Sequence, residues 1–394
     1  MNPMTATLSP TVPAGGVVSP AAEARTQRRL GSLDTMRGVT IAAMVVVNNP
    51  PIGPPYLYAQ LQHAAWNGAT FADTIFPAFL FMAGVSLAFA PPTGLRLVRR
   101  VVVLFALGLI VNAAPLVLAH GGLGHGHLGQ LRTMGVLQRI ALAYLIAALI
   151  VRVVPSRAQL AVGALILLGC WAALVWVRVP GVGAGHLTPS GNLEGFIDRR
   201  VLGPAHMYRA GAVGYDPEGL AGSIPAAVTV ILGCAAGRVL HARRPRAGAV
   251  LVAAGMGSLL TGLAWAQMLP INKRMWTGSY VLFMGGLSLI LLGALHLVFD
   301  RPNRAARLVS APWRALGANP IIVYVGTELT GIALSSFHHV LNGHPAALNT
   351  WIWMTWLQPS FGTRPATVVY AAAVLGAWWL IAAFLYHFRW FVRA

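Results

Sequence analysis

Four polar side chains stand at one edge of two long apolar segments near the start of the chain: Asn48, Asn49, His63 and Asp73. An imidazole titrates at about pH 6.5, so at neutral pH it can accept a proton as a general base or attack an electrophile. A neighbouring amide can donate a hydrogen bond to a developing oxyanion. A carboxylate can orient the imidazole. The grouping therefore predicts acid–base or nucleophilic chemistry at the ends of two apolar segments.

The composition predicts that these segments lie in a bilayer. The chain is 57% hydrophobic and 9% charged, with a mean hydropathy of +0.67, whereas soluble domains carry roughly 25% charged residues. Apolar runs long enough to span a bilayer recur along the sequence. Polar groups are costly inside a membrane and usually face a cavity or a partner. The few polar residues in these segments are thus candidates for function.

We expect an all-α, polytopic helical bundle with about ten transmembrane helices. The predicted spans are 32–49, 70–90, 97–118, 134–154, 158–178, 222–240, 247–268, 278–299, 317–337 and 366–388. Segment 338–365 contains Trp351, Trp353 and Trp356, which indicate an interfacial or re-entrant helix, and an eleventh span there is the alternative.

Arginines between alternate spans predict the orientation. They fall on one side when there are ten spans, and the positive-inside rule makes that side, with both termini, cytoplasmic. This use of the basic residues accounts for the net charge of +19 and argues against nucleic-acid binding. Residues 1–29 are rich in Pro, Ala, Thr and Ser, which predicts a disordered cytoplasmic tail and no cleavable signal peptide. Residues 30–394 form one transmembrane domain.

Further polar residues fall on the predicted outer rim, so a polar pocket that opens outward is expected. They are Trp66, Asn67, Arg139, Asp216, Glu218, Asn272 and Lys273. The residues near this rim also have plainer explanations. His63 could bond a loop carbonyl, Asp73 could pair with Arg139 to join two helices, and residues 272–274 could form a solvated turn. Glu328 is the deepest acid and requires a partner, either in helix packing or in the wall of a tunnel.

Other chemistry-bearing residues have a structural interpretation. Asp34 and Arg37 have the spacing of an ion pair at the start of a helix. His120, His125 and His127 lie in a glycine-rich loop without a nearby carboxylate or cysteine, which favours a flexible surface loop over a metal site. Cys170 and Cys234 fall inside apolar runs, so neither a disulfide framework nor a metal site is expected.

Six motifs together resemble the transmembrane heparan-alpha-glucosaminide N-acetyltransferase family, whose bacterial members are membrane acyltransferases. In chain order they are SLDTMRG, HAAWNGATFADTIFPAFLFMAGVSL, GVLQRIALAY, GYDPEGLAGSIPA, LPINKRMWTGSYVL and LGANPIIVYVG. The resemblance runs from about Leu30 to the C-terminus. It implies an enzyme that takes acetyl groups from cytosolic acetyl-CoA and delivers them to the amine of a glucosamine residue across the membrane.

The resemblance also implies roles for particular residues. The histidine of the HAAWNG block, His63, corresponds to the family's catalytic residue, and Asn48 best matches its helper asparagine, with Asn49 as the alternative. The chain departs from the animal members in lacking their large N-terminal lumenal portion and extra span. Its loop between Asn48 and His63 is also longer and contains PPIGPPY. This second departure leaves the Asn48 match and a heparan acceptor open.

Amide formation from a thioester requires a base and a donor to the oxyanion. We expect His63 to act as base or acetyl carrier, Asn48 to donate to the oxyanion, and Asp73 to orient His63 or to neutralise Arg139. Trp66, Asn67, Arg139, Asp216, Glu218, Asn272 and Lys273 are the candidate substrate-binding residues. Carrying nucleotide phosphates through hydrocarbon is costlier than threading a thin arm. The nucleotide end of acetyl-CoA is therefore expected at Arg37 and Arg100, with Glu328 also assigned to the donor path.

Two other functions are kept as alternatives. One is a transporter or flippase for a small polar or sugar-linked solute, which an internal repeat and broken helices at the midplane would favour. The other is O-acylation of a cell-envelope glycan. The expected partners are an amino sugar and the bilayer of a bacterial inner membrane, with the active-site rim facing the periplasm. The small-residue patches GVSLAFA and GSLLTGLAWA are candidates for packing a homodimer.

Overall fold

The computed structural model describes residues 30–122, 128–208, 214–242, 245–300, 304–341 and 343–391. The tail predicted for residues 1–29 lies outside the described residues, as do His125 and His127. The fold set out below is that of the unit Gly31–Ala394.

Long helices occupy all ten predicted spans. They are α2 (Gly31–Asn48), α3 (Ile75–Phe89), α4 (Gly94–His120), α5 (Val136–Val153), α6 (Gln159–Trp176), α8 (Ser223–His241), α9 (Ala247–Trp265), α10 (Gly278–Phe299), α12 (Pro320–Ser336) and α15 (Thr363–His387). Among the described residues, eight helical segments are long and apolar enough to cross a membrane. The two predicted spans that fall short are α2, which contains Asp34 and Arg37, and α12, which has 17 residues. The all-α, polytopic membrane fold is thereby confirmed.

Segment 338–365 consists of short elements in place of a span. A hairpin of β1 (His338–Leu341) and β2 (His344–Ala347) pairs His338 with Ala347. It is followed by α13 (Leu348–Ile352), a π-helical turn (Trp353–Leu357) and α14 (Gln358–Phe361). Even end to end, these helical pieces are shorter than the roughly 20 residues a span needs. The structure therefore supports the interfacial or re-entrant interpretation over an eleventh span.

Two helices were not predicted from the sequence. Helix α7 (Leu193–Val201) lies within the long 179–221 loop and begins after Asn192, whose side chain accepts a hydrogen bond from Gly195 N at 2.7 Å. Helix α11 (Arg304–Ala318) lies between α10 and α12 and packs on α2. Gly38 permits that packing, because a Cβ there would lie 1.8 Å from the carbonyl oxygen of Trp313.

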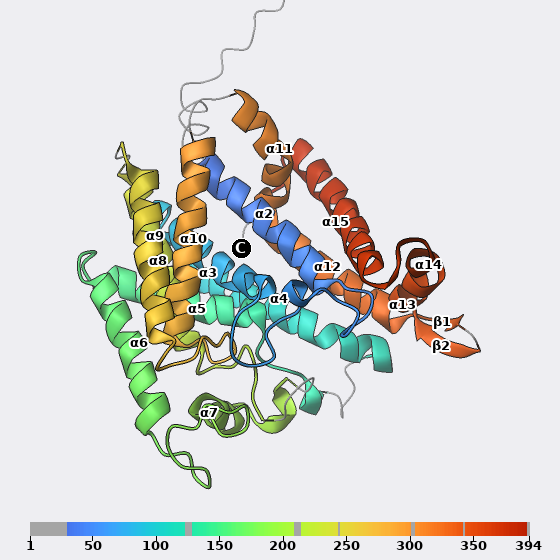
Figure 1. Cartoon of the computed structure of the whole chain (residues 1–394), viewed down its shortest axis with the longest axis horizontal. Coiled ribbons are helices and arrows are strands. Elements are labelled where there is room, and N and C mark those ends of the chain that lie inside the picture. The colour runs from blue at the N-terminus through green and yellow to red at the C-terminus, as the bar shows by residue number, and fades with distance from the viewer. Residues whose placement is uncertain are drawn as a thin grey trace, which may run out of the picture. The chain divides into compact units, whose positions relative to one another are not determined.

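Helix α2 lies between two groups of helices (Figure 1), with α8, α9 and α10 to one side and α11, α12 and α15 to the other. Helices α3 and α8 approach closely at Gly84 and Gly233, where added Cβ atoms would lie 1.9 Å from Val230 O and Phe81 O. Small residues allow this approach in the same way as in other membrane helix pairs. The result places the end of α2 and the starts of α3, α5 and α10 around one set of loops.

Candidate active site

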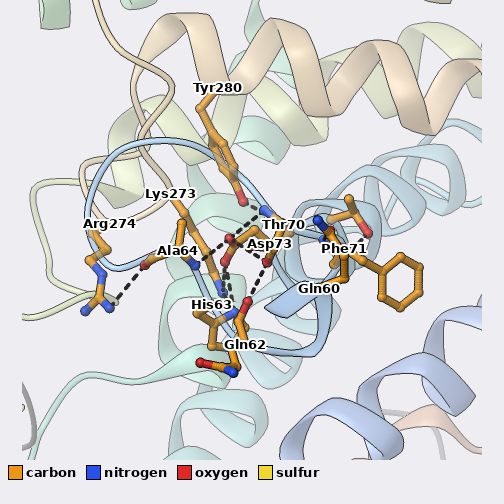
Figure 2. Close-up of polar contacts among 11 residues, drawn as sticks. Gln60, Gln62, His63, Ala64, Thr70, Phe71, Asp73, Lys273, Arg274 and Tyr280 are labelled. Carbon is orange, nitrogen blue, oxygen red and sulfur yellow. Dashed lines mark hydrogen bonds and ion pairs between the residues drawn. The ribbon is translucent and has the colours of Figure 1, made fainter. Parts of the chain in front are cut away.

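His63 lies in the loop between α2 and α3, where its ring faces the carboxylate of Asp73 (Figure 2). The distance from His63 Nδ1 to Asp73 Oδ1 is 2.9 Å. Asp73 belongs to the 3-10 turn Phe71–Thr74 that leads into α3, and its side chain is 1% exposed, whereas that of His63 is 44% exposed. A buried carboxylate thus holds an accessible imidazole.

The same carboxylate also organises the loop that carries His63. Asp73 Oδ2 accepts hydrogen bonds from Ala64 N at 3.0 Å, Thr70 N at 3.1 Å and Thr70 Oγ1 at 3.1 Å. The Tyr280 hydroxyl, from α10, donates to the backbone oxygen of Asp73 at 2.7 Å. Because ionised acceptors make strong hydrogen bonds, Asp73 ties residues 64–70 to the start of α3.

Lys273 completes this group from the loop between α9 and α10. Its Nζ lies 3.1 Å from His63 Nδ1 and 3.3 Å from Asp73 Oδ1. Burial lowers the pKa of Lys273, although the carboxylates of Asp73 and Glu218 oppose that shift. The two contacts of His63 require opposite roles of Nδ1, since it must donate to Asp73 but accept from a lysine ammonium. The site can therefore hold either tautomer of the imidazole.

Asn272, which is fully buried, holds the turn that contains Lys273 in place through side-chain hydrogen bonds. Asn272 Nδ2 donates to Asn67 Oδ1 at 3.0 Å, and Asn272 Oδ1 accepts from Met275 N at 2.9 Å. A backbone hydrogen bond from Gly68 N to Ile271 O, at 2.8 Å, joins the same two loops. Asn67 and Asn272, both predicted to bind substrate, are thus used to hold the His63 and Lys273 loops together.

Trp66 joins this region to the 179–221 loop. Its indole Nε1 donates to Leu187 O at 2.7 Å, and its ring meets that of Tyr215 edge-on, with centroids 4.9 Å apart. Arg274 lies against the same tyrosine and also donates to Ala64 O at 3.4 Å. Trp66 therefore joins the His63 loop to the 179–221 loop, and its polar atom is already paired.

Asp216 and Glu218 lie together, and both are paired with Arg132, a residue that the sequence analysis did not single out. Arg132 donates to Asp216 Oδ2 and Oδ1 at 3.0 and 2.5 Å, and to Glu218 Oε2 at 2.6 Å. Asp216 also accepts from the backbone of Tyr208 and Glu218. Burial acts to lower the pKa of Arg132, but the carboxylates of Glu218 and Asp216 raise it overall.

Arg139, on α5, does not pair with Asp73. It is fully buried, donates from Nη2 to Gly219 O at 3.1 Å, and lies 5.3 Å from the Trp276 ring centroid. In the described part of the chain, the ion-pair partners of Asp73 are His63 and Lys273. The prediction that Asp73 pairs with or neutralises Arg139 is therefore wrong, because a lysine from another loop takes that place.

Two acids on the unpredicted helix α7 share the buried surroundings of Arg139. Burial raises the pKa of Glu194 to about 8, against the attraction of Arg139. Burial likewise raises the pKa of Asp198 to about 6, although Ala221 N donates to this carboxylate at 3.1 Å. Asp198 thus connects α7 to the loop before α8, and neither acid forms a described ion pair with the His63 group.

The two asparagines that end α2 have different partners. Asn48 Nδ2 donates to Glu328 Oε1, on α12, at 2.8 Å. Asn49 Nδ2 donates back to Val45 O at 3.0 Å, and its side chain is buried. Asn48 lines the same cavity as His63. The structure therefore favours Asn48 over Asn49 as the asparagine that serves the site.

This cavity, of about 280 Å³, connects the His63 group with two arginines deeper in the bundle. It is lined by Asn48, His63, Glu218 and Lys273, by Arg37, Ser86 and Arg100, and by apolar side chains that include Ile41, Met44, Phe79, Met82 and Leu104. Arg37 and Asn48 are eleven positions apart on α2, which corresponds to about 16 Å along the helix axis. The site is thus the mouth of an elongated, mostly apolar passage.

The two arginines are held at the far end of the cavity. Arg37 donates to Asp34 Oδ1 at 3.3 Å and to the Ser86 hydroxyl. Arg100 donates from Nη1 to the Tyr144 hydroxyl at 3.2 Å, while its Nε is buried and has no hydrogen-bond partner among the described residues. A buried donor without a partner is costly and suits an anionic ligand. Glu328, predicted to lie on the donor path, contacts the cavity wall through Asn48.

Comparisons with known proteins fit this site. The family model described as heparan-alpha-glucosaminide N-acetyltransferase, catalytic, matches residues 29–194. The human heparan-alpha-glucosaminide N-acetyltransferase is 30% identical over 362 residues, covering 76% of this chain and 53% of the human protein. The mouse enzyme is 30% identical over 359 residues with the same coverage. The chain thus spans about half the length of the curated relatives that it matches, and the resemblance inferred from the six motifs is confirmed.

Proposed function

Because the chain belongs to the heparan-alpha-glucosaminide N-acetyltransferase family, we propose that it is a membrane-embedded acetyltransferase acting on the amine of a glucosamine-type sugar. The observation that carries the proposal is the passage itself. His63, paired with Asp73 and Lys273, lies at one end, and Arg37 and Arg100 lie at the other.

Acetyl-CoA is the proposed acyl donor, and the residues that line the passage fit it. Arg37 and Arg100 would hold the phosphates. The buried Nε of Arg100, which has no hydrogen-bond acceptor among the described residues, would donate a hydrogen bond to a phosphate oxygen. The apolar wall along α2 suits a thin, uncharged arm. Such a donor supplies a thioester carbonyl that an amine can attack.

His63 is the proposed base. When Nδ1 holds a proton and donates it to Asp73, Nε2 is left to accept the proton of the attacking amine. The new C–N bond then forms as the C–S bond breaks, and His63 returns the proton to the departing sulfur. The alternative is a relay in which His63 itself carries the acetyl group, for which the same tautomer leaves Nε2 as the nucleophile.

Asn48 is the proposed oxyanion donor, and Glu328 is its positioning residue. An amide nitrogen carries two hydrogens, and one of those on Asn48 Nδ2 is directed to Glu328 Oε1 at 2.8 Å. The second remains for the developing oxyanion. A preorganised donor of this kind contributes roughly 3 kcal/mol to the transition state.

Glu218 is the proposed dock for the acceptor's ammonium or hydroxyl groups. Asp216 is enclosed by Arg132 and two backbone donors. Glu218, in contrast, lines the cavity and uses only Oε2 in its hydrogen bond to Arg132 among the described residues. Its second oxygen thus offers negative charge on the His63 side of the passage.

The proposed orientation places the His63 rim outside and both termini in the cytoplasm of a bacterial inner membrane. The arginine distribution supports this orientation, and it puts Arg37 and Arg100 on the side from which cytosolic acetyl-CoA would enter. Cysteine labelling at Gln60, in the His63 loop, and at Arg157, in the α5–α6 loop, should give opposite accessibility in intact cells.

The test is release of free thiol from acetyl-CoA by the purified chain, with a panel of amino sugars as acceptors. Thiol release should require an amino sugar, and His63→Ala should reduce it to a small residual rate, whereas His120→Ala, at an exposed histidine outside the cavity, should retain it. Mass spectrometry of the sugar would separate N- from O-acetylation. Retained turnover in His63→Ala would refute the assignment, and solute movement without thiol release would favour the transporter alternative.

A further inference from the structure

A second cavity, separate from the passage, lies between the ends of α3, α5 and α8 and the start of α6. Its volume is about 480 Å³, and its lining includes Pro91, Arg152, Val153, Ser156, Gln159 and Arg238. It shares no lining residue with the passage that contains His63. Neither the catalytic proposal nor the donor path makes use of it.

The charge of this cavity is positive and uncompensated. Among the described residues, its lining contains Arg152 and Arg238 but no aspartate or glutamate. Arg152 makes no hydrogen bond or ion pair among the described residues, and its side chain is exposed. Two cations beside one cavity, without an acid, favour an anionic occupant.

Arg238 is held in place for such a role. Its Nη1 donates to Gln159 Oε1 at 2.6 Å and lies 3.5 Å from Cys234 Sγ. Gln159 is buried, and its amide donates to the carbonyl oxygens of Val151 and Val154 at 3.2 and 2.8 Å, which fixes it at the end of α5. Within the described part of the chain, this arrangement leaves Nε and Nη2 of Arg238 without a hydrogen-bond partner.

The surroundings of the two arginines are apolar and outward-facing. Val153, which lines the cavity, is 80% exposed, and Leu160, the second residue of α6, is 49% exposed. Exposed aliphatic side chains on a membrane helix face lipid tails, whereas arginines near helix ends reach the headgroup region. A ligand with a phosphate and an acyl chain matches this site, because the phosphate can contact the two arginines and the acyl chain can contact the exposed aliphatic side chains.

We infer that this second cavity binds the phosphate headgroup of an anionic phospholipid. Arg152 and Arg238 contact the phosphate, and the acyl chains lie along Val153 and Leu160. The site lies at the end of the bundle where the arginine pattern places the cytoplasmic leaflet, whose anionic lipids attract basic residues.

The test uses the full chain in detergent with phosphatidylglycerol as the probe and phosphatidylcholine as the neutral comparison. Retained lipid is counted by native mass spectrometry, and affinity is obtained by titration of the thermal shift. Phosphatidylglycerol should bind and phosphatidylcholine should not. Each of Arg152→Ala and Arg238→Gln should weaken binding about fivefold. Arg157 is an exposed arginine in the adjoining α5–α6 loop that does not line the cavity, so Arg157→Ala should change binding less than twofold.

Three results would overturn the inference: equal binding of the two lipids, an equal effect of Arg157→Ala and Arg152→Ala, or occupancy by inorganic phosphate with no phospholipid retained. Because the Arg152 side chain makes no described hydrogen bond, its removal leaves the fold intact. Arg152→Ala therefore decides the question even if Arg238→Gln fails to fold.

Discussion

Replacement of Asp73 by asparagine is the sharpest perturbation of the proposed site, because it keeps the shape of the side chain and removes its charge. One carboxylate oxygen faces His63 and Lys273, at 2.9 and 3.3 Å. The other accepts three hydrogen bonds from Ala64 and Thr70. An amide has one acceptor oxygen where a carboxylate has two. The side of the substituted asparagine that receives the NH2 group therefore loses the hydrogen bonds that the Asp73 carboxylate oxygen accepts there.

The magnitude follows from which contacts are lost. Turning the NH2 group toward the loop breaks three hydrogen bonds, at about 1 kcal/mol each. Turning it toward His63 and Lys273 breaks two charge-assisted contacts, at about 1.5–3 kcal/mol each. The first orientation costs about 3 kcal/mol and the second about 3–6 kcal/mol, so the smaller cost is about 3 kcal/mol. If that energy is lost from the transition state, kcat falls about 100-fold.

The assay is acetyl transfer to the best amino-sugar acceptor, with kcat and KM measured separately alongside the melting temperature. Thr70→Val serves as the matched control, since it removes the hydroxyl that contacts Gln62 O and Asp73 Oδ2 and spares the contact between Asp73 and His63. It should lower kcat by no more than about fivefold, equivalent to about 1 kcal/mol. A double variant of Asp73→Asn with His63→Ala should be no slower than His63→Ala alone.

The reasoning is refuted if Asp73→Asn retains the kcat of the parent protein. It is equally refuted if the two substitutions reduce kcat independently, because Asp73 would then act without His63.

Three further predictions test other parts of the structure. Glu328→Leu should lower kcat about 10- to 100-fold with little change in KM, because Asn48 loses its orientation. Glu328→Gln keeps a hydrogen-bond acceptor and should retain most of the rate. Equal losses of kcat in both variants would contradict the positioning role. Arg100→Gln should raise the KM for acetyl-CoA about tenfold and leave kcat nearly constant. Substitution of the exposed Arg96 by Gln should not change the KM. An equal rise of KM in both variants would contradict a specific role of Arg100 in donor binding. Burial raises the pKa of Glu194 to about 8, above its ordinary value of 4.5. The contribution of protonated Glu194 to the free energy of unfolding is therefore full below about pH 4.5, and it is lost as pH rises through about 8. Thermal melts should thus show a fall in melting temperature toward pH 8.5 that Glu194→Gln reduces, and an unchanged slope in that variant would place the pH dependence elsewhere.

The sequence by itself determined the membrane fold and the neighbourhood of the site. Apolar runs of about 20 residues with few charges locate the helices, because a helix satisfies all of its backbone hydrogen bonds within one such segment in lipid. His63 and Asp73 are only ten positions apart and lie at the start of one span, so their proximity follows from local chain geometry. The six motifs identified the family for the same reason, since each is a local run of residues.

Only the tertiary structure decided which partners each polar residue has. Lys273 reaches His63 across 210 positions, and Glu328 reaches Asn48 across 280. Successive residues on a helix point about 100° apart, so the choice between Asn48 and Asn49 depended on where α12 packs. Arg132 and α7 were missed because a single loop arginine and a short amphipathic helix resemble solvated surface. The carboxylate partners of Arg132 lie 84 and 86 positions away, and Asp198 of α7 contacts Ala221, 23 positions away. Local periodicity in the sequence does not report contacts between segments so far apart.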